Sequence, residues 1–312
     1  MNNYQLSFVN CQLKNVSLPK NKRKMKNAIF HQAFGKDLRQ GYKETMGEAL
    51  EGCFELPDEN ELYKTECRLA PMAGEPYETK VTVVNGDCLE VGRTMMGEGL
   101  HPAILNMASN FRPGGGVING SRAQEECIFR RSNLFMSLYR YDKDHFNILS
   151  AMNDNGNYRV SFIEQGYPMD ENYGGFYSGR VTVFKDANYE RMTEPYQTSF
   201  ISVAALNIHG LVSRLGRDVL CDGMLTSEAV QITKNKIRTI YRIGVLHGHD
   251  SLVLGAWGCG AFGNPPRQMA HLFLDVLDEP EFKGRYRDIR FAIIEDCNSM
   301  GRNFQSFKDE IG

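Results

Sequence analysis

Residues 80–116 read KVTVVNGDCLEVGRTMMGEGLHPAILNMASNFRPGGG, and their pattern indicates the class of fold. The β-rich run Lys80–Val84 favours a strand, Asp87–Met96 has the periodicity of a helix, and Ala103–Met107 is a second short apolar run. A strand, a helix and a second strand in this order form the unit from which sheets with covering helices are built. Three consecutive glycines, Gly114–Gly116, follow the second strand.

The alternation of strands and helices continues through the rest of the chain and is weakest in the middle. Further strands are expected at Arg159–Ile163, Val181–Phe184, Phe200–Ala205, Ser251–Trp257 and Ile289–Glu295. Further helices are expected at Ser121–Tyr139, Thr226–Leu246, Pro265–Leu277 and Arg302–Glu310, and a loop or hairpin at Gly166–Gly179. This pattern predicts an α/β fold with helices on both faces of the sheet.

Residues 1–75 differ from the rest in being rich in charge and interrupted by prolines. Helical patterns at Lys22–Phe34 and Glu44–Phe54 predict a helical N-terminal extension, followed by a larger domain at residues 76–312. The extension carries a basic cluster of Lys20, Lys22, Arg23, Lys24 and Lys26. A solvated helix face explains such a cluster better than a nucleic-acid contact does.

Length and composition exclude several classes of protein. The 312 residues are 42% hydrophobic, enough for a substantial core, and 36 basic against 38 acidic residues give a formal charge of −2. The net charge therefore produces no overall electrostatic field that would favour binding to nucleic acid or to an anionic membrane. The chain start lacks the apolar core of a secretion signal, and no run of about 20 apolar residues is present, so a cytoplasmic location is expected.

The cysteines and histidines show no metal-binding pattern. Eight cysteines lie far apart without a C-x-x-C pair, which favours free thiols in a reducing compartment. The seven histidines form no H-E-x-x-H motif, and the close pair His247 and His249 is typical of a helix end. No metal site is expected, and activity should survive a chelator.

The glycine triplet precedes a pair of acids, and seven residues separate it from Gln124-Glu125-Glu126. Glycines allow backbone N–H groups to turn toward a bulky anion, and carboxyl groups can transfer protons. Separately, a glycine triplet usually marks a turn and a Glu-Glu pair a solvated helix face. Together they favour anion binding coupled to acid–base chemistry.

A second glycine loop, GCGAFG at Gly258–Gly263, lies between a predicted strand and a predicted helix with Asn264 as its N-cap. A helix start attracts phosphate, although a tight turn that binds nothing is an equally good explanation. The sequence GCGAFG also matches the glycine-rich fingerprint of dinucleotide binding in nicotinamide and flavin enzymes. The acidic residue expected about 20 positions later is missing, since Glu295 and Asp296 come much later.

Asn85-Gly86-Asp87 ends the first predicted strand, at the edge where open α/β sheets bind ligands. The Asp87 carboxylate is suited to accept a hydrogen bond from an exocyclic amine such as that of adenine. The pattern alone favours the simpler role of helix N-cap.

Several of these segments together resemble the signature of microbial-type poly(ADP-ribose) glycohydrolases, which are catalytic members of the macrodomain superfamily. The run Leu105–Gly116, continuing to Ala123–Glu126 and Arg130–Ser132, carries the resemblance, with VLGAWGCGAF at 253–262 as the diphosphate loop and Asn85–Asp87 on the adenine side. The resemblance spans roughly residues 80–310. It implies a three-layer α/β/α macrodomain with a mixed central sheet.

The resemblance also implies roles for individual residues. Glu126 would be the catalytic acid, Glu125 would contact ribose hydroxyls on the leaving side, and the glycine loops would enclose the diphosphate. The implied substrate-binding residues are Asp87, Asn106, Gly114, Gly115, Gly116, Asn119, Gln124, Gly258, Cys259, Gly260, Ala261 and Phe262. The implied substrate is poly(ADP-ribose) or an ADP-ribosylated protein and the product is ADP-ribose, with no cofactor, no membrane contact and no specific nucleic-acid binding.

The chain departs from the family pattern at three places. Tyr177-Ser178-Gly179-Arg180 stands where members often have Tyr-Ser-Pro-Asp, Val203-Ala204-Ala205 replaces the usual Ala-Pro, and Asn110-Phe111-Arg112 before the triplet is unusual. These differences leave the preferred acceptor and chain length open. Two alternatives remain: a non-catalytic ADP-ribose reader, which only binds its ligand, and a hydrolase of mono-ADP-ribosyl conjugates. Adjacent acids argue against the reader, because they do not help to bind an anionic diphosphate.

Overall fold

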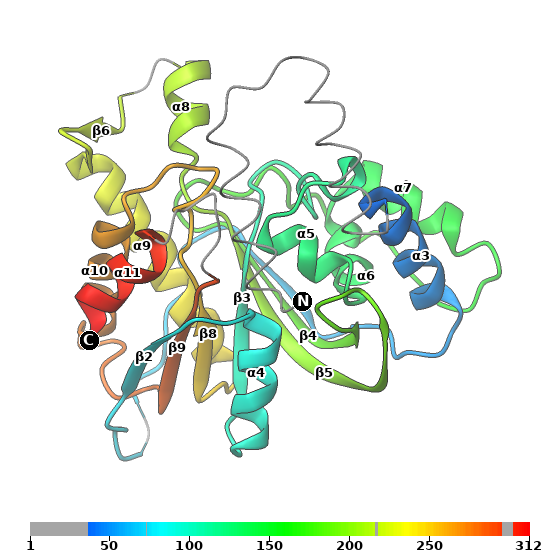
Figure 1. Ribbon diagram of the computed structural model, residues 1–312, viewed down its shortest axis with the longest axis horizontal. Helices are drawn as coiled ribbons and strands as arrows, with labels where there is room; N and C mark the ends of the chain where they lie inside the picture. The colour runs from blue at the N-terminus through cyan, green and yellow to red at the C-terminus, as the bar shows by residue number, and fades with distance from the viewer. Residues whose placement is uncertain (1–36, 73, 216–217, 295–301) are drawn as a thin grey trace, which may run out of the picture.

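A seven-stranded mixed sheet forms the centre of the protein in the computed structural model, which describes residues 37–72, 74–215, 218–294 and 302–312 (Figure 1). The strands are β1 (Asn60–Tyr63), β2 (Lys80–Val84), β3 (Pro102–Met107), β4 (Gly175–Lys185), β5 (Arg191–Val203), β8 (Ser251–Leu254) and β9 (Asp288–Ala292). They lie in the order β1-β4-β5-β3-β8-β9-β2. The pairs from β5 through β2 are parallel, whereas β1–β4 and β4–β5 are antiparallel.

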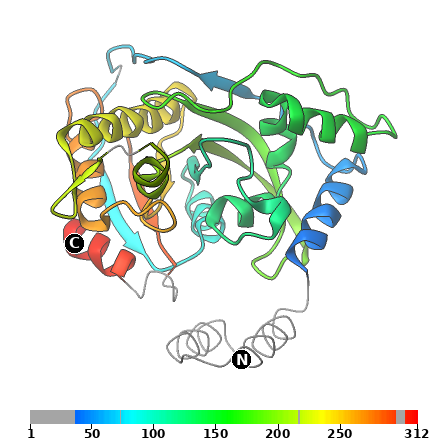
Figure 2. The ribbon, with the colours of Figure 1, turned by 90° about the horizontal axis from the view of Figure 1, so that it is seen from above.

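Helices cover both faces of this sheet (Figure 2). The α-helices are α3 (Leu38–Leu50), α4 (Cys88–Gly97), α5 (Gln124–Phe129), α6 (Leu134–Leu138), α7 (Lys143–Met152), α8 (Ile208–Leu215), α9 (Ser227–Leu246), α10 (Pro266–Leu277) and α11 (Arg302–Ile311). Short 3-10 helices, η1 (Val117–Asn119) and η2 (Tyr139–Tyr141), and a small hairpin of β6 (Leu220–Cys221) and β7 (Met224–Leu225) complete the described elements.

Two hydrophobic clusters, one on each side of the sheet, make up the core. In β3, Ile104 packs into the cluster formed with α3 to α7, while Ala103 and Leu105 pack into the cluster formed with α9, α10 and α11. The alternation follows from the two-residue period of a strand. The expected three-layer α/β/α fold with a mixed sheet is thereby confirmed.

Most elements of the regular β/α pattern form where the sequence predicts them. β2 has the expected bounds, and α4, α9 and α11 begin within one residue of them. β8 ends at Leu254 and β9 at Ala292, so both are shorter than expected. The helix predicted at Glu44–Phe54 lies instead at Leu38–Leu50, with Asp37 as its N-cap. The helix predicted at Lys22–Phe34 and the basic cluster lie outside the described residues.

The single helix expected at Ser121–Tyr139 is wrong, because the chain forms α5 and α6 with a break between them. At the break Ser132 forms a bridge with Val183, and Asn133 N–H donates to the Thr182 carbonyl at 3.1 Å. The Asn133 side chain accepts from Thr182 N–H at 2.8 Å. These residues pair with β4 beyond the end of β1, and this pairing interrupts the helical hydrogen bonds.

Two predictions in the middle section are also wrong. Arg159–Ile163 forms no strand, because its backbone bonds to η2 instead of the sheet: Ile163 N–H donates to the Arg140 carbonyl at 2.9 Å. The expected loop at Gly166–Gly179 ends early, since β4 begins at Gly175. Glycine suits position 175 because an added Cβ would lie 3.0 Å from the Val203 side chain, a tight contact.

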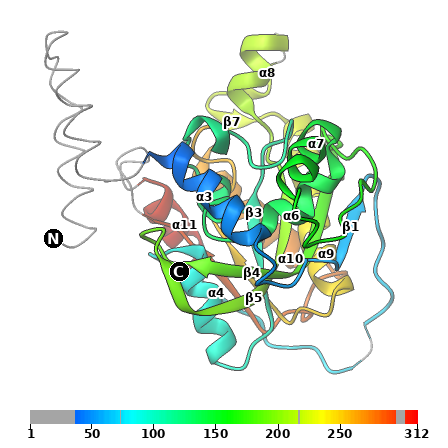
Figure 3. The same ribbon diagram turned by 90° about the vertical axis from the view of Figure 1, so that its right-hand side faces the viewer.

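The segment before residue 76 contributes to the core and to the sheet. In α3, Tyr42, Met46 and Leu50 are buried in the cluster that also contains Phe129 and Phe135. β1 pairs with β4 in antiparallel register. The division into an extension and a domain at residue 75 stays a prediction, while these contacts join α3 and β1 to the rest (Figure 3).

Among the described helices, none has the length and apolar character needed to span a membrane. α8 stands above the edge of the sheet at which β3, β5 and β8 end, and Figure 2 looks down on this edge. The candidate site lies in the loops of that edge.

Candidate functional site

The loops that follow β3, β5 and β8 are hydrogen bonded to one another. Ala108 N–H donates to the Val203 carbonyl at 3.3 Å, and Ile208 N–H donates to the Phe262 carbonyl at 2.9 Å. The Asn264 amide donates to the Leu206 carbonyl at 2.7 Å. Since ligands bind at the carboxyl ends of parallel strands, these connected loops are the expected location of a binding site.

The glycine triplet is required by close approach on every side. Gly114 and Gly115 have φ values of +76° and +53°, and a Cβ on Gly114 would lie 2.6 Å from the Phe129 ring. A Cβ on Gly115 would lie 2.7 Å from Glu126 Oε1 and 3.0 Å from Glu125 Oε2. The turn therefore favours glycine, and it brings the backbone of Gly115 directly against both carboxyl groups.

Backbone N–H groups of this turn hold the two glutamates. Glu125 accepts from Ser109 N–H at 2.8 Å and from Gly114 N–H at 3.1 Å. Glu126 Oε1 accepts from Gly116 N–H at 2.8 Å, while Glu126 Oε2 is buried with no hydrogen-bond partner in the described part of the protein. Two of the triplet N–H groups thus bind the carboxyl groups themselves, which fixes the acids in a defined position.

Burial changes the protonation of the first acid. Removal from water raises the pKa of Glu125 to about 8, with the nearby Glu126 charge acting in the same direction and the Ser109 N–H bond opposing it. Glu125 is 3% exposed and Glu126 is 6% exposed. The Glu125 carboxyl is therefore largely protonated near neutral pH.

Asn106 and Gln124 connect the acids to β3. The Gln124 amide donates to the Leu105 carbonyl at 2.7 Å and its oxygen accepts from Met107 N–H at 2.8 Å, so Gln124 fastens the start of α5 to the strand. The Asn106 amide donates to Ser202 Oγ at 3.0 Å and to Glu125 at 3.4 Å. Substrate contact by Gln124 and Asn106 stays a prediction, whereas their support of the carboxyl pair is observed.

The second glycine loop is closed by Asn264. Its amide donates to the Gly258 carbonyl at 3.0 Å, and its N–H donates to the same oxygen at 3.0 Å. The expected N-cap role of Asn264 is wrong, because Pro265 occupies the cap position while the Asn264 side chain holds the loop. Among the described residues, Gly260, Ala261 and Phe262 offer N–H groups that donate to no protein acceptor, as an anion cradle requires.

Asp87 is the N-cap of α4, as the sequence favours. Its carboxylate accepts from Leu89 N–H at 3.1 Å and Glu90 N–H at 3.3 Å, and it pairs with Arg131 at 2.8 Å. Asn119 is exposed on η1 and Cys259 is partly buried, with burial raising the pKa of the Cys259 thiol. Ligand contacts of these three residues stay predictions.

Several residues near the acids carry no sequence signal that marks them. Ser109 and Ser202 are common polar residues, and the tyrosines that interact electrostatically with Glu125, namely Tyr42, Tyr139 and Tyr167, come from distant segments. Their proximity depends on long-range packing. Their closeness to the acids can be identified only from the contacts of the folded chain.

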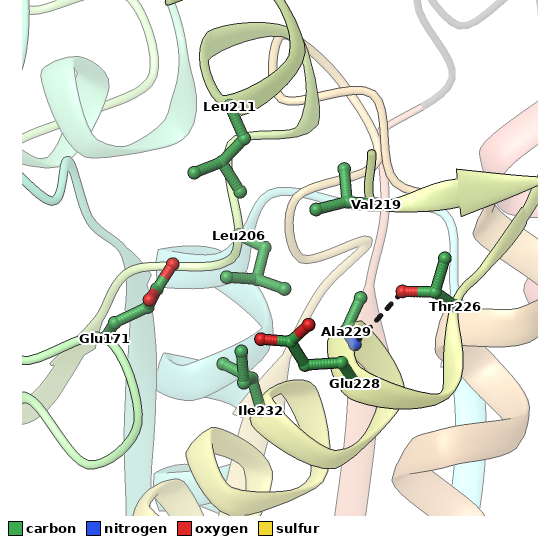
Figure 4. Close-up of a pocket in the computed structure, with 8 residues that line it drawn as sticks. All are labelled: Glu171, Leu206, Leu211, Val219, Thr226, Glu228, Ala229 and Ile232. Atoms are coloured by element: carbon green, nitrogen blue, oxygen red, sulfur yellow. Dashed lines mark hydrogen bonds between the residues drawn. The ribbon is translucent and has the colours of Figure 1, made fainter. Parts of the chain in front are cut away.

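A small hollow lies between α8 and α9 (Figure 4). Leu206, Leu211 and Ile232 line it together with Glu171 and Glu228. No predicted site residue belongs to its lining. The chemistry of the paired acids, not this hollow, therefore identifies the candidate site.

The fold and the site together define a macrodomain-like α/β protein, with glycine loops at the carboxyl edge of the sheet and an adjacent pair of buried glutamates. Residues 40–186 match the family model of the microbial-type PARG catalytic domain. The match contains the glycine triplet and both acids and ends before the second glycine loop. No curated protein sequence matches the chain.

Solved structures of bacterial poly(ADP-ribose) glycohydrolases share the fold. The enzyme from Thermomonospora curvata is 27% identical with a TM-score of 0.66, over 88% of this chain and 98% of that one. A structure of that enzyme with the inhibitor ADP-HPD is 28% identical, with a TM-score of 0.56 over 74% and 79% of the two chains. The Deinococcus radiodurans enzyme with ADP-ribose, 22% identical with a TM-score of 0.58 over 89% and 90%, supports the fold alone.

Proposed function

We propose that the protein is a glycoside hydrolase that cuts the ribose–ribose O-glycosidic bonds of poly(ADP-ribose) and releases ADP-ribose. The observation that carries the proposal is the state of Glu126. One carboxyl oxygen is held by Gly116 N–H at 2.8 Å, and the other is buried with no partner in the described residues. An acid fixed through one oxygen and free at the other is arranged to exchange a proton with a bound substrate.

The reaction follows from this geometry. Glu126, in its acid form, donates a proton to the ribose oxygen that leaves, while the bond from that oxygen to the anomeric carbon breaks and its electron pair stays on the oxygen. The Glu126 carboxylate then takes a proton from water as the water oxygen attacks the oxocarbenium-like carbon. One water is consumed, and Glu126 ends in the acid form in which it began.

A single residue takes both roles because the two acids do not face each other. Most glycosidases place two carboxyl groups on opposite sides of the scissile bond. Here Glu125 and Glu126 both approach the backbone of Gly115, so they lie on one side. We assign Glu125 to contact with the ribose hydroxyls and to support of Glu126.

The second glycine loop is a better candidate than the glycine triplet for binding the diphosphate of the substrate. N–H groups of Gly114 and Gly116 already donate to the glutamates, whereas those of Gly260, Ala261 and Phe262 point to no acceptor among the described residues. We therefore place the diphosphate mainly against this loop, with the triplet closing the other side. Its negative charge would stabilise the developing cation.

The Glu126→Gln variant tests the assignment. It keeps the shape of the side chain but supplies no proton, so turnover of poly(ADP-ribose) should fall by a factor on the order of 10² to 10⁴. Its affinity for ADP-ribose, measured by calorimetry, should stay close to that of the wild type. Glu194→Gln, at a side chain that is 86% exposed, is the matched control and should retain full turnover.

Substantial turnover by Glu126→Gln would refute the role of Glu126. Wild-type protein incubated with chains and with mono-ADP-ribosylated protein separates the other candidates by the ADP-ribose released. Release only from the mono-modified protein would favour the conjugate hydrolase, and tight ADP-ribose binding without any release would favour the reader.

We also propose a cytoplasmic location, without contact to membranes or specific nucleic acids. The cysteines of the described residues, Cys53, Cys67, Cys88, Cys127, Cys221 and Cys259, are free thiols. Free thiols fit a reducing compartment. The net charge of −2 supports the absence of nucleic-acid binding.

A further inference from the structure

Arg130, which directly follows α5, is a buried cation without a carboxylate partner among the described residues. Its guanidinium donates from Nε to the Leu38 carbonyl at 3.2 Å and from Nη2 to the Ser121 carbonyl at 2.5 Å, while Nη1 is buried without a partner there. The buried Arg131 and Arg242, by contrast, pair with carboxylates. Because a buried charge without a counter-ion is costly, its presence indicates a role other than stability.

The two carbonyls that Arg130 binds belong to different segments. Leu38 is the first residue of α3, and Ser121 ends the turn that follows the glycine triplet, residues 116–121. The segments are in contact, since a Cβ added to Gly120 would lie 3.8 Å from Leu38 Cβ. A planar guanidinium fork holds two acceptors in fixed relative positions, whereas an ammonium group has no such fork. Arg130 therefore connects the start of α3 to the turn 116–121.

Helix α3 is itself anchored to the end of α5 and to β4. Thr45 Oγ1 donates to the Arg130 carbonyl at 2.8 Å and accepts from Lys185 Nζ at 3.0 Å. Lys185, the last residue of β4, also pairs with Glu48 at 2.6 Å. The Arg130 guanidinium lies 6.0 Å from the centre of the Tyr189 ring, within the range of a cation–π contact. The start of α3 thus forms a fixed point for the guanidinium.

The turn 116–121 connects Arg130 to the acid Glu126. Ser121 N–H donates to the Gly116 carbonyl at 3.1 Å, and a Cβ added to Gly116 would lie 2.9 Å from Ser121 Cβ. Gly116 N–H donates to Glu126 Oε1 at 2.8 Å, while Oε2 of the same carboxyl group is buried without a partner in the described residues. Because Oε1 is the held atom, the direction of Oε2 depends on the position of Gly116.

The turn 116–121 has few other attachments. Its backbone bonds are largely internal, as where Asn119 N–H donates to the Gly116 carbonyl at 2.9 Å, and its tip at Asn119 is exposed. In the described part of the chain, Arg130 and Glu126 are the side chains from outside the turn that form hydrogen bonds with it. Loss of the guanidinium would therefore loosen the turn at the residue that packs against Gly116.

We propose that Arg130 is a positioning residue of the hydrolytic site. Its guanidinium ties the turn 116–121 to the start of α3 and so keeps Gly116 N–H on Glu126 Oε1, with Oε2 free for the substrate. The inference rests on the proposed function and deepens it. It also makes α3 necessary for the geometry of the acid, although the sequence assigns this helix to an N-terminal extension.

The Arg130→Lys variant keeps the charge and the stem but loses the fork that donates to both carbonyls. We expect kcat on poly(ADP-ribose) to fall about tenfold, while the Kd for ADP-ribose changes by less than about twofold, because the diphosphate lies mainly against the second glycine loop. Arg242→Lys is the matched control. It replaces another buried arginine, near the end of α9, that pairs with Glu281 at 2.7 Å, so it should lower the melting temperature and leave kcat unchanged.

A second measurement does not depend on turnover. The Gly116 amide proton lies in a hydrogen bond to Glu126, so its NMR signal reports the length of that bond. The signal should move upfield in Arg130→Lys, as the bond lengthens, and should stay in place in Arg242→Lys. A merely structural role of Arg130 predicts no such change at Gly116.

Thr45→Val is the second variant, for the case in which Arg130→Lys does not fold. It removes the hydroxyl that α3 places on the Arg130 carbonyl, and it should lower kcat about threefold and move the Gly116 signal in the same direction. An unmoved Gly116 signal overturns the inference, as does an unchanged kcat, or an equal loss of kcat in Arg242→Lys. If wild-type protein releases no ADP-ribose, a moved signal still supports the link from Arg130 to Gly116 while the proposed function fails.

Discussion

At the scale of single residues, the site depends on backbone space more than on the identity of the acids. Glutamate pairs are common on helices, but here the absence of a side chain at Gly115 lets both carboxyl groups approach the chain. The same turn supplies N–H groups that hold Glu125 and Glu126. Flexible side chains thereby acquire fixed positions, as proton transfer requires.

Gly115→Ala should impair catalysis more than folding. The added methyl group would meet Glu126 Oε1 at 2.7 Å, and the carboxyl groups would move because they are the ends of flexible side chains. Displacement of this size should lower kcat on the order of 10²-fold. Gly156→Ala, at φ +69° with no atom nearby, is the control, and should cost about 1 kcal/mol of unfolding free energy at full kcat. Similar kcat values for the two variants would contradict this account.

At the scale of elements, the start of α5 is aligned by hydrogen bonds to β3, and its end is joined to α4. The Gln124 side chain bonds the backbone of β3, and Arg131, just after α5, pairs with Asp87 and Glu90 at the start of α4. Arg131 has a side chain that is 3% exposed. A short helix that is marginal by itself is thus stabilised by tertiary contacts.

Arg131→Met should therefore destabilise the fold through α4 and α5 together. Removing one partner of a buried ion pair costs roughly 3–5 kcal/mol, and we expect about 3 kcal/mol because Asp87 keeps some solvent contact. Arg93→Met, which removes an exposed arginine 3.8 Å from Glu194, should cost less than about 1 kcal/mol. Urea unfolding of both variants measures the difference, and equal losses would argue against the buried pair.

At the scale of the whole molecule, opposite edges of the sheet carry groups with opposite pH behaviour. Glu125 lies at the carboxyl edge with its pKa raised to about 8, whereas burial lowers the pKa of His249, just before β8, to about 4. The folded protein binds the Glu125 proton more tightly than the unfolded chain does, so this stability is lost as pH rises toward 8. The folded protein binds the His249 proton less tightly, so that contribution is lost as pH falls below about 6.5.

Two neutral variants separate these contributions. The melting temperature of Glu125→Gln relative to wild type should increase from pH 5 to pH 8, because the variant has no charge to bury. The melting temperature of His249→Gln relative to wild type should increase as the pH falls from 6.5 to 4.5, for the same reason. Differences that stay constant with pH in either variant would show that the corresponding group titrates normally in the folded protein.

The β/α units on either side of the glycine loops could be predicted from sequence, because a buried parallel strand and its covering helix have local patterns. β2, α4 and α9 are examples. The middle of the chain could not be predicted in this way. The start of β4 is a glycine that packs closely against Val203, and the break between α5 and α6 depends on pairing with Thr182. Such contacts join residues far apart in sequence, where periodicity carries no information.

For the site, the sequence by itself determined the glycine triplet, the adjacent acids and the second glycine loop, because close backbone approach and proton transfer demand those residue types. Only the tertiary structure decided that two triplet N–H groups hold the acids and that Asn264 closes the second loop. The physical reason is that burial and hydrogen-bond partners arise from packing of the whole chain.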